Sequence, residues 1–177
     1  PPMIEQVNFS GQAGMKLSEL YRLAGDRMAA PLPVFSPDAG DPDLAGITAD
    51  SRKVGPGFLF VALKGNAADA ARFIPQAIAA GASAILTHSE AEISGIDVLV
   101  AKNDDPRPAL SALAAAFYPQ QPETMVAVTG TAGKTSVVAF VRQIWEQAGY
   151  AAASIGTTGV VAPGRDDYGS LTTPDPV

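Results

Sequence analysis

The stretch Val126-Ala127-Val128-Thr129-Gly130-Thr131-Ala132-Gly133-Lys134-Thr135-Ser136 decides how this chain is organised. Apolar residues come first, and a loop with two glycines, a lysine and several hydroxyl groups follows. The next residues predict a helix that ends at Gly149, because its apolar side chains recur at helical spacing: Val137, Phe140, Val141, Ile144, Trp145 and Ala148. We therefore predict a buried strand, a glycine loop and an amphipathic helix, in that order.

This order of elements is typical of a site that holds a polyphosphate. A helix start leaves backbone N–H groups unpaired and carries partial positive charge, and glycines let that backbone approach phosphate oxygens. Lys134 adds a cation for the outer phosphates, and the hydroxyl of Thr135 or Ser136 suits Mg²⁺. The common P-loop pattern has glycine where this chain has Val128. The alternative is a simple glycine turn with a chance lysine.

Composition narrows the class of protein. The chain has 177 residues, 47% of them hydrophobic, and a net charge of −6, which argues against general nucleic-acid binding. It contains no cysteine, so disulfides and thiolate metal sites are excluded. It has no apolar run long enough to span a membrane, and we expect a cytoplasmic enzyme. Residues 1–14 resemble a polar extension of the first domain.

The residues before the loop predict a mostly parallel α/β sheet. Apolar runs that indicate strands alternate with helical patterns, and one of them, residues 58–63, is apolar enough to be covered on both faces. The predicted strands cover residues 47–52, 58–63, 84–88 and 98–101, and the predicted helices begin near residues 17 and 75. Gly81 is expected to stop the second of these helices.

A domain boundary is predicted near residue 104. Asp105 and Pro106 suit the start of a further helix, as N-cap and first helical residue, and that helix ends at Tyr118. We assign residues 15–104 to a first domain and residues 105–177 to a second, ATP-binding domain. The second includes a predicted strand at 151–156 and a hairpin or loop from Gly159 to Gly169. It is too short to complete a nucleotide-binding sheet, so we expect it to be truncated.

Three segments together resemble the Mur ligases, and among them the MurE type. They are Thr48-Ala49-Asp50-Ser51-Arg52 with the strand that follows it, the loop Val128–Thr135, and Thr172-Thr173-Pro174. The resemblance explains the missing early glycine, because the family's loop is Thr-Gly-Thr-Asn-Gly-Lys-Thr. Ala132 departs from that loop, since the family commonly has asparagine there.

The resemblance implies roles for individual residues. ATP is expected at Gly130, Thr131, Ala132, Gly133, Lys134, Thr135 and Ser136, with Lys134 catalytic and Thr135 on Mg²⁺. The UDP-linked substrate is expected at Ala49, Ser51, Asn66, Ala67, Ala68, Thr172 and Thr173. Two possibilities remain open for Arg52, which pairs either with a substrate phosphate or with Asp50. His88, the only histidine, is interpreted as structural.

The implied activity is ATP-dependent amide formation in peptidoglycan synthesis. A diamino acid would be added to UDP-MurNAc-L-Ala-D-Glu through an acyl phosphate, with meso-diaminopimelate favoured over L-lysine. Chain 1–177 alone is expected to be inactive. The alternatives are a MurF-type ligase that adds a dipeptide, a non-catalytic nucleotide-binding module, and an unrelated P-loop kinase; the kinase leaves the segment around Asp50 unexplained.

Overall fold

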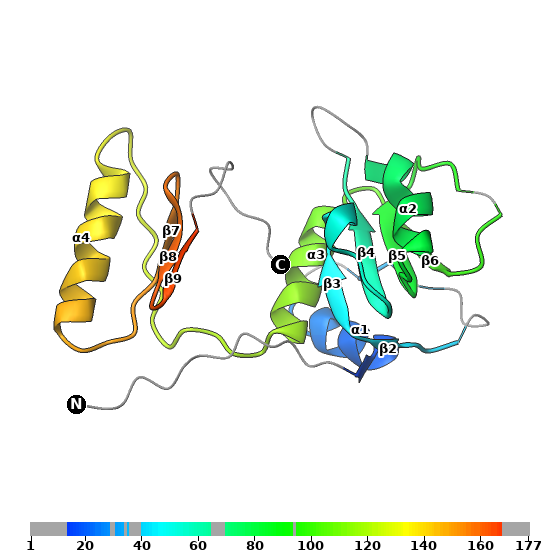
Figure 1. Cartoon of the computed structure of the whole chain (residues 1–177), viewed down its shortest axis with the longest axis horizontal. Coiled ribbons are helices and arrows are strands. Elements are labelled where there is room, and N and C mark those ends of the chain that lie inside the picture. Colours follow the sequence, from blue (N-terminus) through cyan, green and yellow to red (C-terminus); the bar gives the residue numbers. More distant parts are fainter. Residues whose placement is uncertain are drawn as a thin grey trace. The chain divides into compact units, whose positions relative to one another are not determined.

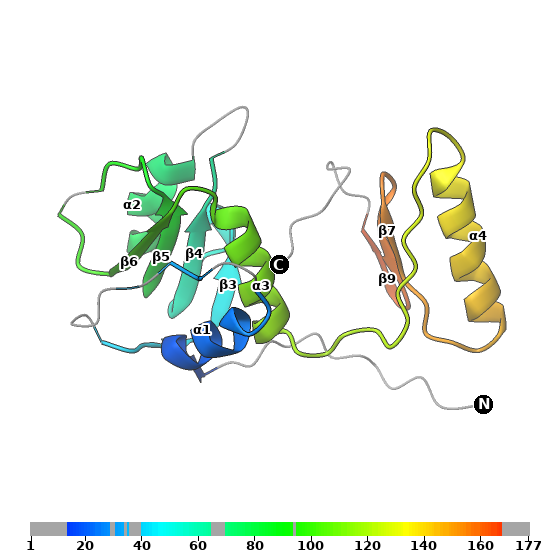
Figure 2. The same ribbon diagram turned by 180° about the vertical axis from the view of Figure 1, so that it is seen from behind.

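The computed structural model describes residues 14–28, 31–33, 35, 40–64, 70–93 and 95–167. It separates the chain into two compact units that meet in the sequence between Gln121 and Pro122. We call the described residues up to 121 the N-terminal unit and those from 122 to 167 the C-terminal unit. Figures 1 and 2 show the elements of both units from opposite sides.

A parallel sheet forms the centre of the N-terminal unit. Its strands lie in the order β3-β4-β5-β6, and every neighbouring pair is parallel. Leu59 lies opposite Ala84, which lies opposite Leu99. The strands are Gly46–Thr48 (β3), Phe58–Ala62 (β4), Ala84–His88 (β5) and Leu99–Asn103 (β6). The predicted parallel α/β sheet is confirmed.

Helices cover both faces of this sheet, as the two views show (Figures 1 and 2). Side chains alternate along β4, so Leu59 and Val61 pack with α1 and α3, whereas Phe60 and Ala62 pack with α2. The helices are Leu17–Gly25 (α1), Ile74–Ala79 (α2) and Pro106–Phe117 (α3). Burial on both faces explains why residues 58–63 form a near-continuous apolar run.

Short elements join these layers. Strand β1 (Met15–Lys16) pairs antiparallel with β2 (Asp43–Leu44), and the 3-10 turns η2 (Ser51–Lys53) and η3 (Ala70–Phe73) follow β3 and precede α2. Gly81 ends the turn after α2 with φ of +97°. A Cβ atom at this glycine would lie 2.9 Å from Cα of Pro56, so a side chain is excluded by space as well as by backbone conformation.

The structure corrects the predicted domain boundary near residue 104. Asp105 caps α3 as predicted, because its carboxylate accepts a hydrogen bond from the N–H of Arg107. However, Leu110, Leu113 and Phe117 of α3 are buried in the same cluster as Leu59. Helix α3 therefore belongs to the N-terminal unit, and the division follows it at residue 121. The capping residues predict the helix, but they do not say which sheet the helix covers.

The C-terminal unit contains one helix and a small antiparallel sheet. Helix α4 covers Lys134–Gln147, and Gly149 follows it with φ of +90°, as predicted. The sheet has the order β7-β8-β9, with strands Ser154–Gly156, Gly159–Ala162 and Arg165–Asp167. Of the hairpin or loop predicted from Gly159 to Gly169, the described residues form a hairpin of β8 and β9. The predicted strand 151–156 is shortened to its last three residues.

The predicted buried strand before the loop is wrong for this chain. Residues 126–128 form no strand, and Val126 is 57% exposed. Phe140 and Ile144 on the apolar side of α4 are also exposed. A strand needs neighbours to accept and donate its ladder hydrogen bonds, and none of the strands described in the C-terminal unit pairs with these residues. No helix in the described ranges is long and apolar enough to cross a membrane.

Candidate functional site

The glycine loop is built as a backbone cradle at the start of α4. Gly130 has φ of +145° and Gly133 has φ of +78°, and both values disfavour a side chain. Gly133 is the N-cap of α4, and no side chain caps the helix there. A Cβ atom at Gly133 would meet nothing within 4 Å, so the glycine is needed for backbone conformation rather than for space. The first N–H groups of α4 are thus left open to an anion.

Two polar side chains close this loop. The Nζ atom of Lys134 donates a hydrogen bond to the carbonyl oxygen of Gly130, at 2.5 Å. The hydroxyl of Thr135 lies 3.1 Å from the hydroxyl of Thr157, in the turn between β7 and β8. Thr131, Ala132 and Ser136 are exposed. The predicted ATP-binding residues 130–136 thus lie in the loop before α4 and in the first turn of that helix.

The hydroxyl oxygen in this loop suits a Mg²⁺ ion that is bound together with a polyphosphate. Mg²⁺ prefers hard oxygen ligands and usually keeps waters and phosphate oxygens beside one or two protein groups. Thr135 offers one such oxygen at the helix start. Among the described residues, no three His, Asp or Glu side chains gather to form a metal site of their own. The loop therefore suits a metal that arrives with the nucleotide.

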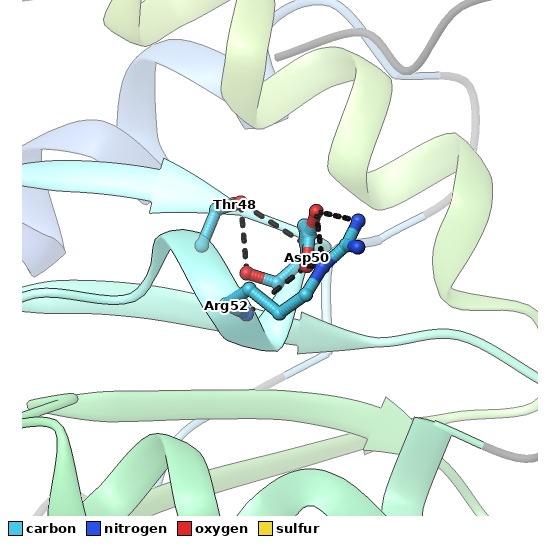
Figure 3. A network of polar contacts seen from close by, with 3 residues as sticks. All are labelled: Thr48, Asp50 and Arg52. Atoms are coloured by element: carbon cyan, nitrogen blue, oxygen red, sulfur yellow. Dashed lines mark hydrogen bonds and ion pairs between the residues drawn. The ribbon is translucent and has the colours of Figure 1, made fainter. Parts of the chain in front are cut away.

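A second candidate region follows β3 at the carboxyl edge of the sheet (Figure 3). The carboxylate of Asp50 accepts hydrogen bonds from the backbone N–H, Nε and Nη2 of Arg52, at 3.0, 2.9 and 2.7 Å. The N–H of Asp50 donates to the hydroxyl of Thr48, at 3.1 Å. These bonds fix the backbone on both sides of Ser51. Ligands of open α/β sheets bind at this edge of the strands.

The ion pair also sets the charge state of this region. Hydrogen bonds from the Arg52 side chain lower the pKa of Asp50 to about 2. Arg52 is 83% exposed, whereas Asp50 is 22% exposed. Of the two possibilities open for Arg52, the structure contains the pair with Asp50. Ala49 and Ser51 are half-buried beside it.

Several predicted site residues lie outside the described residues. Asn66, Ala67 and Ala68 fall between Lys64 and Ala70, and Thr172 and Thr173 fall beyond residue 167. Their assignment to the UDP-linked substrate stays a prediction. His88 is buried at the end of β5, in agreement with its structural interpretation.

Sequence reasoning missed other polar groups at the same sheet edge. Lys64 pairs with Glu90 at 2.6 Å, Ser89 donates to Asp104 at 2.6 Å, and Arg107 donates to the carbonyl oxygen of Lys64. The sequence could have indicated them by their position, because these residues follow the ends of β4, β5 and β6. Thr157 was also missed, and its only signal was a hydroxyl in a turn between two glycines.

Comparison with known protein families gives one match for each of these two regions. Residues 43–118 match the Mur ligase family, catalytic domain, and residues 128–177 match the Mur ligase middle domain. The gap between the two matches contains the division at residue 121. The chain belongs to the Mur ligase family.

Within that family, the chain is similar to proteins named UDP-N-acetylmuramoyl-L-alanyl-D-glutamate–2,6-diaminopimelate ligase. It is 57% identical to the one from Mesorhizobium japonicum over 85% of this chain and 31% of the relative. It is 59% identical to the one from Agrobacterium fabrum over 79% of this chain and 28% of the relative. The chain thus spans less than a third of the length of these relatives. A solved structure of a ligase of that name matches with a TM-score of 0.60 and 26% identity, over 76% of this chain and 27% of the other.

Proposed function

We propose that this chain forms part of an ATP-dependent ligase that joins a diamino acid to UDP-MurNAc-L-Ala-D-Glu in peptidoglycan synthesis. The similarity to relatives named for 2,6-diaminopimelate supports that diamino acid over L-lysine. The observation that carries the proposal is the loop geometry. Left-handed Gly133 exposes the N–H groups of α4 at the point where Lys134 and Thr135 project. A cytoplasmic location belongs to this proposal.

The two units would contribute different binding residues. In the C-terminal unit, residues 130–136 would hold ATP, and Thr135 would contribute a ligand to Mg²⁺. In the N-terminal unit, Ala49 and Ser51 would contact the UDP end of the substrate, together with Asn66, Ala67 and Ala68. Thr172 and Thr173 would contact the muramoyl-dipeptide. The Asp50–Arg52 pair supports this assignment because it holds Ser51 at the carboxyl edge of the sheet.

The chemistry follows from the charges. The γ-phosphoryl group of ATP passes to the side-chain carboxylate of D-Glu, which gives an acyl phosphate and ADP. The amine of the diamino acid then attacks the acyl carbon, so that an amide forms, inorganic phosphate leaves and the nitrogen loses a proton. Lys134 and the N–H groups of the loop would reduce repulsion between the two anionic reactants. Mg²⁺ would add charge neutralisation across the phosphate oxygens.

Calorimetry with UDP-MurNAc-L-Ala-D-Glu tests the assignment of the N-terminal unit. We expect chain 1–177 to bind this substrate weakly or moderately and to release no phosphate when ATP and diaminopimelate are added. Ser51→Ala should weaken binding about 2- to 10-fold, which is what one lost hydrogen bond is worth. Ser83→Ala is the matched control, because Ser83 is equally half-buried and precedes β5 at the amino edge of the sheet. A folded chain that gives no binding heat would argue against the assignment.

A further inference from the structure

The turn between β7 and β8 places a hydroxyl beside the glycine loop. Thr157 Oγ1 lies 3.1 Å from Thr135 Oγ1, although 22 positions separate the two residues in the sequence. Strand β7 also contacts helix α4. The contact between Thr157 and Thr135 places the turn at the start of that helix. Thr157 is therefore the neighbour of the one side chain that the proposed function assigns to the metal.

The turn itself is tightly constrained. Gly156 lies opposite Gly159 in the pairing of β7 with β8, which leaves only Thr157 and Thr158 in the loop between them. Neither threonine has positive φ, and Gly159 takes the left-handed conformation with φ of +95°. The glycine absorbs the reversal of the chain, so Thr157 is held in a short loop with an ordinary backbone. A hydroxyl on such a turn is well suited to keep a fixed direction.

A hydroxyl that ligates a cation needs an acceptor for its proton. The side chain of Thr135 has one O–H donor and two acceptor lone pairs. When one lone pair faces Mg²⁺, the O–H must point elsewhere, and the oxygen of Thr157 lies within hydrogen-bond distance. Partners of this kind orient metal ligands and tune their affinity. The contact joins two exposed residues, so its contribution to stability is small and does not by itself explain the arrangement.

We propose that Thr157 is a positioning residue for the nucleotide–metal site. Its hydroxyl oxygen accepts a hydrogen bond from the O–H of Thr135 and so turns a lone pair of Thr135 towards the cation. This inference rests on the proposed function, because it requires that residues 130–136 bind a nucleotide with a divalent cation. It assigns no contact between Thr157 and the substrate. The role predicts a specific pattern, in which metal binding depends on Thr157 while nucleotide binding without metal does not.

The test measures Mn²⁺, as a spectroscopic substitute for Mg²⁺, bound to chain 1–177 with a non-hydrolysable ATP analogue. Electron paramagnetic resonance reports the free and bound cation, and calorimetry in EDTA reports the analogue alone. Thr157→Val keeps the shape of the side chain but removes the hydroxyl, and we expect it to weaken Mn²⁺ binding about 10-fold. Binding of the analogue in EDTA should stay unchanged. Thr157→Ser restores a hydroxyl and should return Mn²⁺ affinity to within about 2-fold of the original chain.

The matched control is Thr158→Val, which makes the same substitution at the next position of the same turn, where the side chain is also exposed. It should bind Mn²⁺ as the original chain does. Equal Mn²⁺ affinity in Thr157→Val, an equal loss in Thr158→Val, or an equal loss in EDTA would each overturn the positioning role while the proposed function stands. If the original chain binds no analogue with or without Mn²⁺, the proposed nucleotide site fails and the inference fails with it.

Discussion

Lys134 is the residue on which the proposed chemistry depends most. In the structure its ammonium group donates to the carbonyl of Gly130, so the charge already lies over the loop. A phosphate oxygen would compete for the same donor, because Lys carries three N–H groups and no acceptor. The side chain is exposed and needs no rearrangement of a packed core to make that exchange.

Lys134→Ala should abolish phosphate release by the full-length ligase. Loss of one preorganised donor to a developing charge costs about 100- to 1000-fold in rate, and Lys134 also carries a full charge. The measurement is phosphate release with ATP, UDP-MurNAc-L-Ala-D-Glu and diaminopimelate. Arg165→Ala removes one exposed cation from β9 in the same unit and serves as the control for net charge. Unchanged turnover in Lys134→Ala would remove this residue from the mechanism.

Asp50 should make the stability of the N-terminal unit depend on acid pH. Its pKa is lowered from 3.8 to about 2 by the Arg52 side chain. A lowered pKa in the folded state stabilises the fold above the unfolded value and loses that effect as pH falls from about 4 to about 2. Because Arg52 is largely exposed, we expect Asp50 to contribute no more than about 1 kcal/mol to the free energy of unfolding.

The test is urea denaturation of Asp50→Asn across that pH range, followed by circular dichroism. Asparagine can still accept the hydrogen bond from the Arg52 N–H, so the substitution isolates the ion pair from the turn. Above pH 4 the variant should be less stable than the original chain, and the difference should vanish near pH 2. Asp97→Asn changes an exposed carboxylate of the same unit and is the control. A difference that stays constant with pH would show that the ion pair is not its cause.

At the scale of single residues, the sequence indicates chemistry better than contacts. The loop lysine and hydroxyls were identified because their types and spacing are local. The choice for Arg52 between Asp50 and a phosphate could not be made from the sequence, because both partners satisfy a guanidinium equally well. The contact of Thr157 with Thr135 could not be predicted, since it depends on how the β7–β8 turn folds back onto α4.

At the scale of elements, the sequence predicted those helices and strands that depend on a local pattern of residues. Strands β3 to β6 and helices α1 to α4 were expected near their observed positions, because apolar periodicity and capping residues mark them. The strand expected at 126–128 failed for the opposite reason. Its apolar residues carry the correct pattern, but a strand forms only when a neighbour completes its hydrogen bonds. Exposed Phe140 and Ile144 show that part of the apolar side of α4 is likewise uncovered by the described residues.

At the scale of the whole molecule, the position of the domain boundary decides how the chain can be divided. The loop-forming residues and the proline at 103–106 predicted a domain boundary before α3. Packing places the boundary after α3, because this helix covers one face of the parallel sheet. Local breaks in pattern occur at every loop, whereas a boundary is set by which surfaces are buried together.

Two shorter chains test this division. Residues 14–121 retain α3 and should unfold cooperatively, whereas residues 14–104 should not fold. Removing α3 uncovers the face that contacts Leu110, Leu113 and Phe117, which are 2%, 0% and 1% exposed. Truncating a single buried leucine costs about 2–5 kcal/mol, and a whole domain has only about 5–15 kcal/mol of stability. Loss of the complete helix therefore exceeds what the remaining core can supply.

Leu113→Ala in chain 14–121 measures the contribution of one side chain from α3 without removing the helix. It should lower the free energy of unfolding by about 2–5 kcal/mol and keep a cooperative transition. Ser111→Ala changes an exposed position of the same helix and should have little effect. A cooperative transition of chain 14–104 at the midpoint of chain 14–121 would return the boundary to residue 104. In that case α3 would cover one face of the sheet without being needed for its stability.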